Sequence, residues 1–192
     1  SMALDVTQKK KTEAQIRYMS FHDSLTDLYN RAYLEEEIKR LDTSRQYPLG
    51  IIMGDINSLK LINDAYGHEK GDELIKKTAE ILQKSCREED IIARWGGDEF
   101  IILLPQTTQK EAENIKKRIK NNCAQCEAYP VPVSIALGIG IKNQPADGIN
   151  EVIRDAEDKM YKNKLTQSRS IKNEVLKALL TTLKEKSKET EK

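Results

Sequence analysis

Two adjacent acids follow two glycines in the stretch Arg94-Trp-Gly-Gly-Asp-Glu-Phe100, which separates the apolar runs 91–93 and 100–104. Paired glycines between two strand-like runs predict a β-hairpin, because glycine adopts the positive φ angles that tight turns require. Bare glycines also let a ligand approach the backbone closely. Asp98 and Glu99 are therefore expected at the end of a hairpin, where they could hold a metal-bound phosphate.

A third acid, Asp55, closes the apolar run that begins at Leu49. A carboxylate beside a buried strand is costly unless it is paired or liganded. If this strand lies next to the hairpin, Asp55, Asp98 and Glu99 form a cluster whose mutual repulsion a divalent cation would relieve. Oxygen ligands favour Mg²⁺ or Mn²⁺ over zinc. The alternative is that all three are ordinary strand-end and turn acids.

The polar stretch 63–72 is predicted to be a loop that leads into a helix. Its simplest role is to cap that helix, although a cap needs only one such residue. Asn63 and Asp72 together could bind guanine, since a carboxylate accepts from N1–H and the 2-amino group and an amide donates to O6. Adenine lacks those donors and would be rejected.

Three further features carry weaker signals. In a chain that is 33% charged, the spacing Arg87-x-x-Asp90 arises readily by chance. Lys164, near the end of an apolar-striped helix, would by default complement the helix dipole. The pair Cys123 and Cys126 has no second pair and no nearby histidine, which favours reduced thiols over a metal or redox site.

Length and composition predict one domain with extensions, since the chain has 192 residues. The net charge of +1 provides no global field that would attract nucleic acid or an anionic membrane. No apolar run approaches the roughly 18 residues of a membrane span. We therefore expect a cytoplasmic protein with no membrane segment and no nucleic-acid partner.

The elements that would position these residues alternate between helices and strands. Hydrophobic periodicity predicts helices over 31–41, 108–119 and 150–165, a helix of about four turns on the apolar positions 74–82, and strands over 49–56, 91–93, 100–104 and 131–141. Thr108 and Glu111 form a capping box at the start of the third helix. Because the hairpin excludes an all-parallel sheet, we expect an α+β sandwich with a mixed, mostly antiparallel sheet flanked by helices.

Both ends of the chain are expected to be helical extensions. The segment 4–22 is polar and lysine-rich and suits a connecting helix. In the tail, apolar residues recur at helical spacing, namely Ile171, Val175, Leu176, Leu179, Leu180 and Leu183. Such a stripe must cover something. It either packs on the domain, pairs with a second chain or belongs with a further domain, and the last two are favoured.

Taken together, these motifs resemble the GGDEF family of diguanylate cyclases over about residues 20–169. The matching segments, in order, are 23–31, 55–64, 67–72, 96–100, 133–135 and 161–164. The resemblance implies a palm-type, ferredoxin-like nucleotidyl cyclase fold. It also implies a bacterial signalling enzyme that condenses two GTP into cyclic di-GMP and pyrophosphate, with Mg²⁺ or Mn²⁺, in a homodimer.

The resemblance also implies roles for individual residues. Asp55, Asp98 and Glu99 would be catalytic and, with the Ile56 carbonyl, would bind the metal. The residues that would hold the phosphates are Gly96, Gly97, Ser58, Leu59, Lys60 and Lys164. Asn63 and Asp72 would bind guanine, as their hydrogen-bonding groups also suggest. Arg87 and Asp90, with Arg94 as a helper, would form an inhibitory site for cyclic di-GMP.

Four positions depart from the family's pattern. Ser168 stands where the family often has an arginine, which puts one triphosphate contact in doubt. Ala136 replaces a frequent glycine, Leu59 a common phenylalanine and Asn57 a frequent aspartate. None of these changes removes an implied metal ligand.

The flanks resemble the exit of a PAS sensor and the lead-in to an HD-GYP phosphodiesterase domain. The implied organisation is a linker helix at 1–21, the GGDEF domain at 22–169 and a helical linker at 170–192. An alternative function is a catalytically weak domain that binds GTP or cyclic di-GMP and controls an attached HD-GYP phosphodiesterase. A purely structural dimerisation segment is a third, but nothing structural requires the three-acid cluster.

Overall fold

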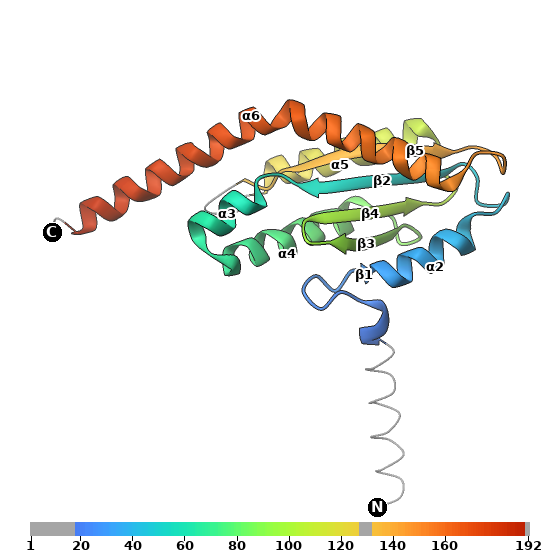
Figure 1. Cartoon of the computed structure of the whole chain (residues 1–192), viewed down its shortest axis with the longest axis horizontal. Helices are drawn as coiled ribbons and strands as arrows, with labels where there is room; N and C mark the ends of the chain where they lie inside the picture. Colours follow the sequence, from blue (N-terminus) through green and yellow to red (C-terminus); the bar gives the residue numbers. More distant parts are fainter. Residues whose placement is uncertain (1–17, 127–131, 191–192) are drawn as a thin grey trace, which may run out of the picture.

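The computed structural model describes residues 18–126 and 132–190; in the last helix, side chains are described to Thr166 and at 173, 176, 177, 180 and 181. The strands are β1 (Tyr29–Asn30), β2 (Leu49–Ile56), β3 (Ile91–Gly96), β4 (Glu99–Leu104) and β5 (Ile135–Lys142) (Figure 1). The helices are α2 (Arg31–Leu41), α3 (Leu59–Tyr66), α4 (His68–Ser85), α5 (Gln109–Gln125) and α6 (Ile149–Thr190).

The strands form one sheet in the order β1-β3-β4-β2-β5. Strand β1 runs parallel to β3, and the pairs β3–β4, β4–β2 and β2–β5 are antiparallel. The predicted mixed, mostly antiparallel sheet is therefore confirmed. Every residue of β2 is buried, because it has a strand on each side and helices over both faces. This explains why its sequence is a continuous apolar run rather than an alternating one.

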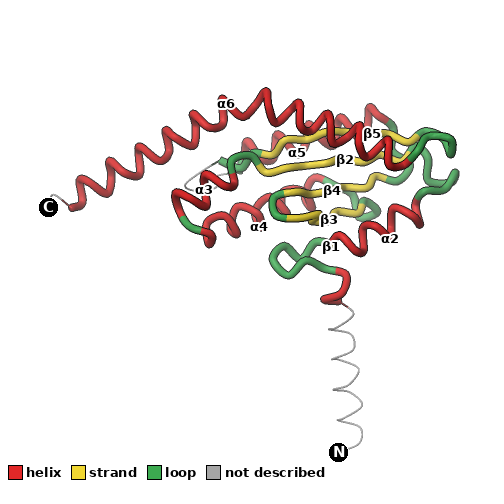
Figure 2. The backbone as a smooth tube through the Cα atoms, in the orientation of Figure 1, coloured by secondary structure: helices red, strands yellow, loops and turns green. Residues whose placement is uncertain are grey.

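Two apolar cores lie on opposite faces of the sheet, so the domain has three layers (Figure 2). On one face, residues of α3, α4 and α5 pack against sheet side chains such as Ile52 and Phe100. On the other, residues of α2 and α6 pack against the alternate side chains, such as Ile51 and Ile101. Neighbouring residues of one strand thus enter different cores, as the period of two in a strand requires.

Most predicted elements are confirmed, although several differ in length from the prediction, including α4 (His68–Ser85) and α5, which ends at Gln125. The capping box of α5 is present, since Thr108 accepts from the Glu111 amide and Glu111 accepts from the Thr108 amide. Strand β5 begins at Ile135, later than predicted, and Val131 lies outside the described residues. Helix α6 extends far beyond the predicted 165 and runs without a break to Thr190, a span of 42 residues.

The terminal extensions are only partly described. The predicted helix over 4–22 lies outside the described residues except for its last five positions. Of the apolar stripe in the tail, Leu176 and Leu180 are about half exposed on α6. The side chains of Ile171, Val175, Leu179 and Leu183 lie outside the described part of the structure.

The prediction of a loop over 63–72 is wrong. Helix α3 continues to Tyr66 and α4 begins at His68, so only Gly67 interrupts helical structure. Gly67 has φ +87°, and its amide still bonds to the Asn63 carbonyl. Most of the polar residues, such as Asp64 and Asp72, lie on exposed helix faces, because burial of Leu59 and Ile62 fixes the other side of α3. The density of Asn, Asp and Gly therefore marked a sharp bend between two helices.

A buried ion pair joins β5 to the end of α2, away from the acids. The Lys142 side chain is only 4% exposed, and its Nζ lies 2.9 Å from Asp42 Oδ1. The Tyr47 hydroxyl donates to the same carboxylate. Burial alone would lower the pKa of Lys142, but Asp42 and Tyr47 outweigh it and the pKa is raised.

Replacing Asp42 with alanine is expected to lower the free energy of unfolding by about 3 kcal/mol, because it leaves the buried ammonium without its carboxylate. The double variant Asp42→Ala/Lys142→Met should recover most of this loss, as measured by urea unfolding at pH 7. Because the pKa of Lys142 is raised, its contribution is complete below its ordinary pKa and is lost as the pH rises through the folded value. Equal stability of Asp42→Ala and the parent chain would contradict this expectation.

Candidate active site

The three acids predicted to cluster lie at one end of the sheet. Strand β2 pairs antiparallel with β4, which sets Asp55 directly opposite Glu99. The predicted hairpin is confirmed as β3–β4, with Gly97 at φ +20° in its turn. The Ile56 amide donates to the Asp98 carbonyl at 3.0 Å, which ties the turn to the end of β2. The expectation that β2 lies beside the hairpin is therefore confirmed.

Negative charge accumulates at this end of the sheet. Asp55 is 6% exposed, and burial raises its pKa; the charge of Asp98 adds to the rise, while Lys164 opposes it. Burial also raises the pKa of Glu99, and the charges of Asp55, Asp98 and Glu157 add to that rise. Glu157, on α6, is an acid that the sequence reasoning missed. These carboxylates destabilise one another when ionised, so the site favours a bound positive charge.

Lys164 supplies one positive charge from α6. Its Nζ lies 2.6 and 2.7 Å from the two carboxylate oxygens of Asp55, across 109 positions of sequence. Helix α6 reaches this position because it packs directly on β5, where an added Cβ at Gly138 would lie 1.9 Å from the Ala156 carbonyl oxygen. By periodicity alone Lys164 would only have complemented a helix end, whereas the fold places it on the acid cluster.

The donor set fits a hard divalent cation that arrives with its own oxygen ligands. Within residues 18–126 and 132–190, no three carboxylates, imidazoles or thiolates are grouped closely enough to hold a metal by themselves. Mg²⁺ typically binds through one or two carboxylates and completes its shell with waters and substrate phosphates. Asp55, Asp98 and Glu99 provide only oxygen atoms, and their repulsion is the kind that such an ion relieves.

A phosphate-sized anion would meet free backbone amides beside these acids. Between β2 and α3, Ser58 adopts a left-handed conformation (φ 63°, ψ 18°), which is uncommon for a residue other than glycine. Its side chain makes no capping bond to the first turn of α3, so the amides there are not used by it. Helix N-termini of this kind bind anions. Lys60 is exposed in the same turn, and Figure 1 shows α3 at the same end of the sheet as the β3–β4 turn.

Asn63 and Asp72 lie on two helices that meet closely. Gly71 of α4 packs under Asn63 of α3, where an added Cβ would lie 1.8 Å from Asn63 Oδ1. That oxygen is buried and has no hydrogen-bond partner among the described residues. Asp72 follows Gly71 and is exposed. The helices that carry the pair predicted to bind guanine therefore meet beside Asn63 and Gly71, and the binding role of Asn63 and Asp72 stays a prediction.

The side chain of Arg94 bonds to the glycine turn. The resemblance had implied that it helps Arg87 and Asp90. Its guanidinium donates to the Gly97 carbonyl at 2.7 and 3.1 Å and to the Asp23 carboxylate at 3.1 Å. Burial would raise the pKa of Asp23, but hydrogen bonds from Thr26 and Arg94 outweigh it and hold the pKa below its ordinary value. Asp23 thus connects residues before β1 to the turn that carries Asp98.

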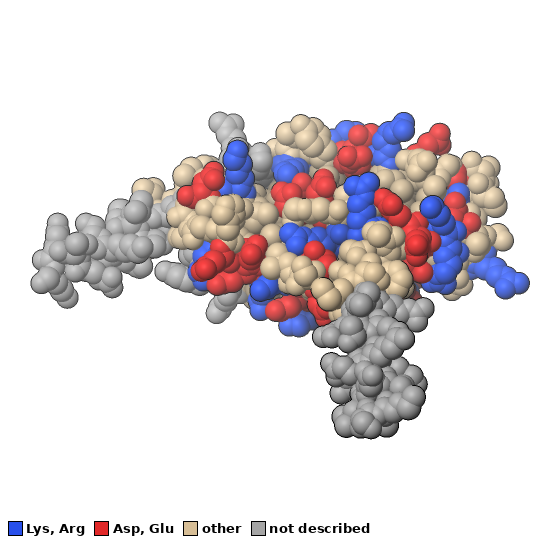
Figure 3. All heavy atoms as spheres, turned by 60° about the horizontal axis from the view of Figure 1, so that its bottom comes forward, with Lys and Arg blue, Asp and Glu red and all other residues tan. Residues whose placement is uncertain are grey.

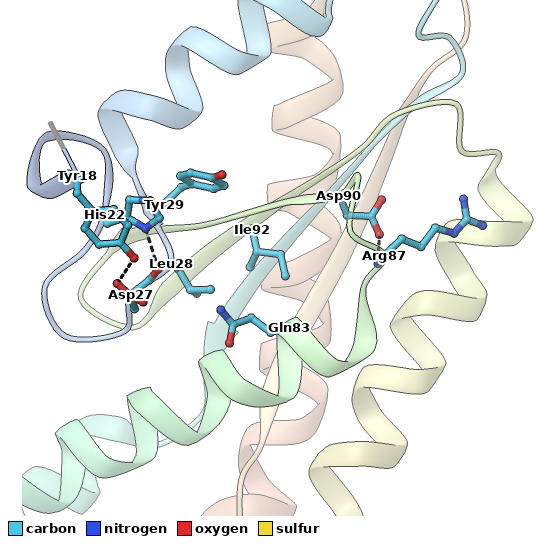
Figure 4. Close-up of a pocket in the computed structure, with 9 residues that line it drawn as sticks. All are labelled: Tyr18, His22, Asp27, Leu28, Tyr29, Gln83, Arg87, Asp90 and Ile92. Atoms are coloured by element: carbon cyan, nitrogen blue, oxygen red, sulfur yellow. Dashed lines mark hydrogen bonds between the residues drawn. The ribbon is translucent and has the colours of Figure 1, made fainter. Parts of the chain in front are cut away.

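Arg87 and Asp90 lie at the opposite end of β3, beside a pocket of about 350 Å³ (Figure 4). The lining residues are Tyr18, His22, Asp27, Leu28, Tyr29, Gln83, Arg87, Asp90 and Ile92. Asp90 is 8% exposed; its Oδ2 accepts from the Arg87 amide at 2.7 Å, and its Oδ1 has no partner among the described residues. The Arg87 side chain extends away from the pocket in Figure 4, toward Glu89 at 3.8 Å.

The cysteines lie outside this site. Cys123 and Cys126, at the end of α5, are free thiols, as is Cys86. Burial raises the pKa of Cys123 to about 12, so this thiol stays neutral and packs in the core.

On the face shown in Figure 3, acidic and basic side chains are interspersed. In the described part of the chain, no helix has the length and apolar character needed to span a membrane.

A three-layer domain with acids at the end of a glycine-turn hairpin is a palm-type nucleotidyl cyclase fold. Residues 20–170 match the family model described as "Diguanylate cyclase, GGDEF domain", and the chain belongs to this family. The coiled coil and GGDEF domain of DgcB from Caulobacter crescentus, in complex with c-di-GMP, aligns with a TM-score of 0.76 over 86% of this chain and 91% of DgcB's, at 20% identity. This likeness shows the fold alone.

Proteins named as a diguanylate cyclase and as a cyclic di-GMP phosphodiesterase are both among its relatives. Diguanylate cyclase DgcM of Escherichia coli (strain K12) is 31% identical over 166 residues, which are 83% of this chain and 40% of DgcM. Cyclic di-GMP phosphodiesterase PdeR of the same strain is 27% identical over 161 residues, which are 82% of this chain and 24% of PdeR. The chain thus spans less than half the length of these relatives.

Proposed function

We propose that this domain is a diguanylate cyclase that condenses two GTP into cyclic di-GMP. The observation that carries the proposal is the placement of Asp55 opposite Glu99, with Asp98 in the adjoining turn and Lys164 on Asp55. In each of two steps, the 3′-hydroxyl of one GTP attacks the α-phosphate of the other. A phosphodiester bond forms, the bond to pyrophosphate breaks and the hydroxyl proton is lost, so that two pyrophosphates leave overall.

The chain's own residues bind and orient the substrate. Asp55, Asp98, Glu99 and the Ile56 carbonyl would hold the cation. When bound, Mg²⁺ or Mn²⁺ lowers the pKa of the attacking hydroxyl and offsets charge in the phosphoryl transition state. The backbone from Ser58 to Lys60 and at Gly96 and Gly97 would cradle the phosphates, with Lys164 released from Asp55 to neutralise them. Asn63 and Asp72 would select guanine.

Catalysis would require two copies of the chain, because each presents one substrate site and the reaction joins two GTP. Positioning the two nucleotides face to face supplies the remaining acceleration. We also propose that Arg87 and Asp90 bind cyclic di-GMP as an inhibitor. The proposal also includes the domain boundaries: a linker helix at 1–21, the GGDEF domain at 22–169 and a helical linker at 170–192. The neighbouring domains would be a PAS sensor and an HD-GYP phosphodiesterase, in a bacterial cytoplasm. The partial coverage of relatives is compatible with such a longer parent chain.

A second candidate is a catalytically weak domain that binds GTP or cyclic di-GMP and controls an attached phosphodiesterase. Two observations favour it. Ser168 stands where the family often has an arginine. A relative that matches over 82% of this chain is named as a cyclic di-GMP phosphodiesterase. The two candidates differ in whether bound GTP is turned over.

The test is to incubate concentrated protein with GTP and Mg²⁺ and to separate the nucleotides by chromatography. Cyclic di-GMP should accumulate with the parent chain and with Glu113→Gln, a change at an exposed acid of α5 that is remote from the cluster. It should not accumulate with Asp98→Ala. If GTP binds to the parent chain at high protein concentration but is not converted, the regulatory candidate replaces the cyclase.

A further inference from the structure

The Asp55 carboxylate is engaged at both of its oxygens by a side chain of the protein itself. Lys164 Nζ lies 2.6 Å from Asp55 Oδ1 and 2.7 Å from Asp55 Oδ2, so one ammonium spans the whole carboxylate. The Asp55 side chain is only 9% exposed, whereas that of Lys164 is 34% exposed. The aspartate is therefore the fixed partner of this pair, and the lysine is the partner that can turn away.

Helix packing brings Lys164 to this position. Helix α6 lies along β5 (Figure 1), and the backbone of Ala156 and Met160 approaches Gly138 so closely that no Cβ would fit between them. Lys159 of the same helix donates to the Ile139 carbonyl at 3.0 Å, which is a second attachment to β5. Lys164 lies one turn beyond Met160 on the same face of α6. Its ammonium is thus kept beside the acids by the core and not by the ion pair alone.

An ammonium and a divalent cation compete for such a carboxylate. Mg²⁺ binds carboxylate oxygens at about 2.0–2.1 Å, so a cation that binds Asp55 must displace Lys164 from at least one oxygen. Positive charges brought this close also repel each other. The charge of Lys164 acts on Glu99 as well, where it opposes the rise in the pKa of that carboxyl group. The lysine therefore already offsets part of the negative charge that would attract a cation.

A triphosphate provides what is needed to draw the lysine away. It carries several negative charges at neutral pH, and lysine binds phosphate oxygens as a point charge. When the lysine exchanges Asp55 for a phosphate, both oxygens of Asp55 become available to a cation. The phosphates themselves supply further oxygen ligands, as Mg²⁺ usually requires.

We propose that Lys164 takes the place of the cation on Asp55 until a nucleoside triphosphate binds, so that the ion and the triphosphate enter the site together. The inference rests on the proposed function and adds an order of events to it. Lys164 lowers the affinity of the nucleotide-free site for a divalent ion, and the phosphates restore that affinity. By linkage, the ion and the triphosphate raise the affinity for each other by the same factor.

The test measures the binding of Mn²⁺ alone to the full chain, without nucleotide, from the electron paramagnetic resonance signal of the free ion. Lys164→Met should bind Mn²⁺ about 10-fold more tightly than the parent chain, a size usual for coupling between two ligands. Lys164→Arg keeps a positive charge on Asp55 and should stay within about 3-fold of the parent. Lys162→Met removes an exposed lysine of the same helix and should also stay within about 3-fold.

Binding of the triphosphate should change in the opposite direction. The probe is a GTP analogue with a methylene group between the α- and β-phosphorus atoms, which cannot release pyrophosphate. In isothermal titration with saturating Mn²⁺, Lys164→Met should bind this analogue about 10-fold more weakly than the parent, because a charged contact to phosphate is lost. A lysine that only binds phosphate would weaken analogue binding and leave the affinity for Mn²⁺ alone unchanged.

The remaining outcomes separate this proposal from the proposed function. If Lys164→Met and the parent bind Mn²⁺ alone equally, or if Lys162→Met tightens Mn²⁺ binding as much as Lys164→Met, the proposal is overturned, and the cyclase stands if the parent still forms cyclic di-GMP. If the parent binds Mn²⁺ neither with nor without the analogue and forms no product, the proposed function fails as well.

A milder variant keeps the test valid if Lys164→Met does not fold. Lys164→Gln has a neutral amide that still donates to Asp55, and it should also bind Mn²⁺ more tightly than the parent. Addition of Mn²⁺ should raise its urea unfolding midpoint more than that of the parent, because an ion that binds the folded chain more tightly stabilises it more. An equal rise in the two midpoints would overturn the proposal.

Discussion

Replacing Asp55 with asparagine is expected to lower the rate of cyclic di-GMP formation by about 1000-fold while leaving the protein at least as stable. The carboxylate would be lost as a cation ligand at the point where β2 meets the hairpin. Asparagine has nearly the same shape, so packing in the buried position is kept. A loss of this size corresponds to about 4 kcal/mol of transition-state stabilisation.

Stability provides the second, independent measurement on this variant. Burial and the charge of Asp98 raise the pKa of Asp55, so the folded chain binds its proton more tightly than the unfolded chain. The ionised carboxylate therefore costs stability at pH 7, and this cost disappears as the pH falls below the ordinary pKa of an aspartate. The neutral amide of the variant removes the cost, although Lys164 loses its partner; Lys164 is about one third exposed and can turn to water.

The free energies of unfolding of Asp55→Asn and of the parent chain should be compared by urea unfolding. The comparison is made at pH 7 and at pH 4, without divalent ions. The advantage of the variant should be larger at pH 7 than at pH 4. Glu113→Gln is the control, since it changes neither rate nor stability noticeably. A variant that unfolds much more readily than the parent would show that Asp55 is a structural partner of Lys164 and not a strained cation ligand.

Replacing Gly138 with alanine is expected to cost about 3 kcal/mol or more of folding stability. The added Cβ would lie 1.9 Å from the Ala156 carbonyl oxygen and 2.3 Å from the Met160 amide nitrogen. Both atoms belong to the backbone of α6, so the clash cannot be relieved by turning a side chain. The whole helix must move off β5, and Lys164 moves with it.

Gly50→Ala is the matched control for this prediction. Gly50 also lies in the sheet, on β2, but its added Cβ would come no closer than 3.1 Å to the side chain of Leu104. It should cost about 1 kcal/mol or less, as judged by urea unfolding of both variants. If Gly138→Ala were as stable as Gly50→Ala, α6 would not pack on β5 as closely as the structure shows.

Local features of the sequence were sufficient to predict an element where the interactions that fix this element lie within a few residues. The glycine pair before Asp98 specified a hairpin because a two-strand turn is closed by its own residues. Thr108 and Glu111 specified the start of α5 because a capping box lies within four positions. The stretch 63–72 shows the limit of such reasoning, since its composition suggested a loop while buried Leu59 and Ile62 kept it helical.

The sequence by itself therefore determined most of the elements, the mixed sheet and the residues able to do chemistry, since each follows from spacing over a few turns or strands. Only the tertiary structure decided which of these residues meet. Lys164 reaches Asp55 because Gly138 lets α6 lie against β5, and Asp23 reaches Arg94 because residues before β1 fold back beside β3. Contacts of this kind join positions up to 109 residues apart. They are fixed by packing between layers, which no short stretch of sequence contains.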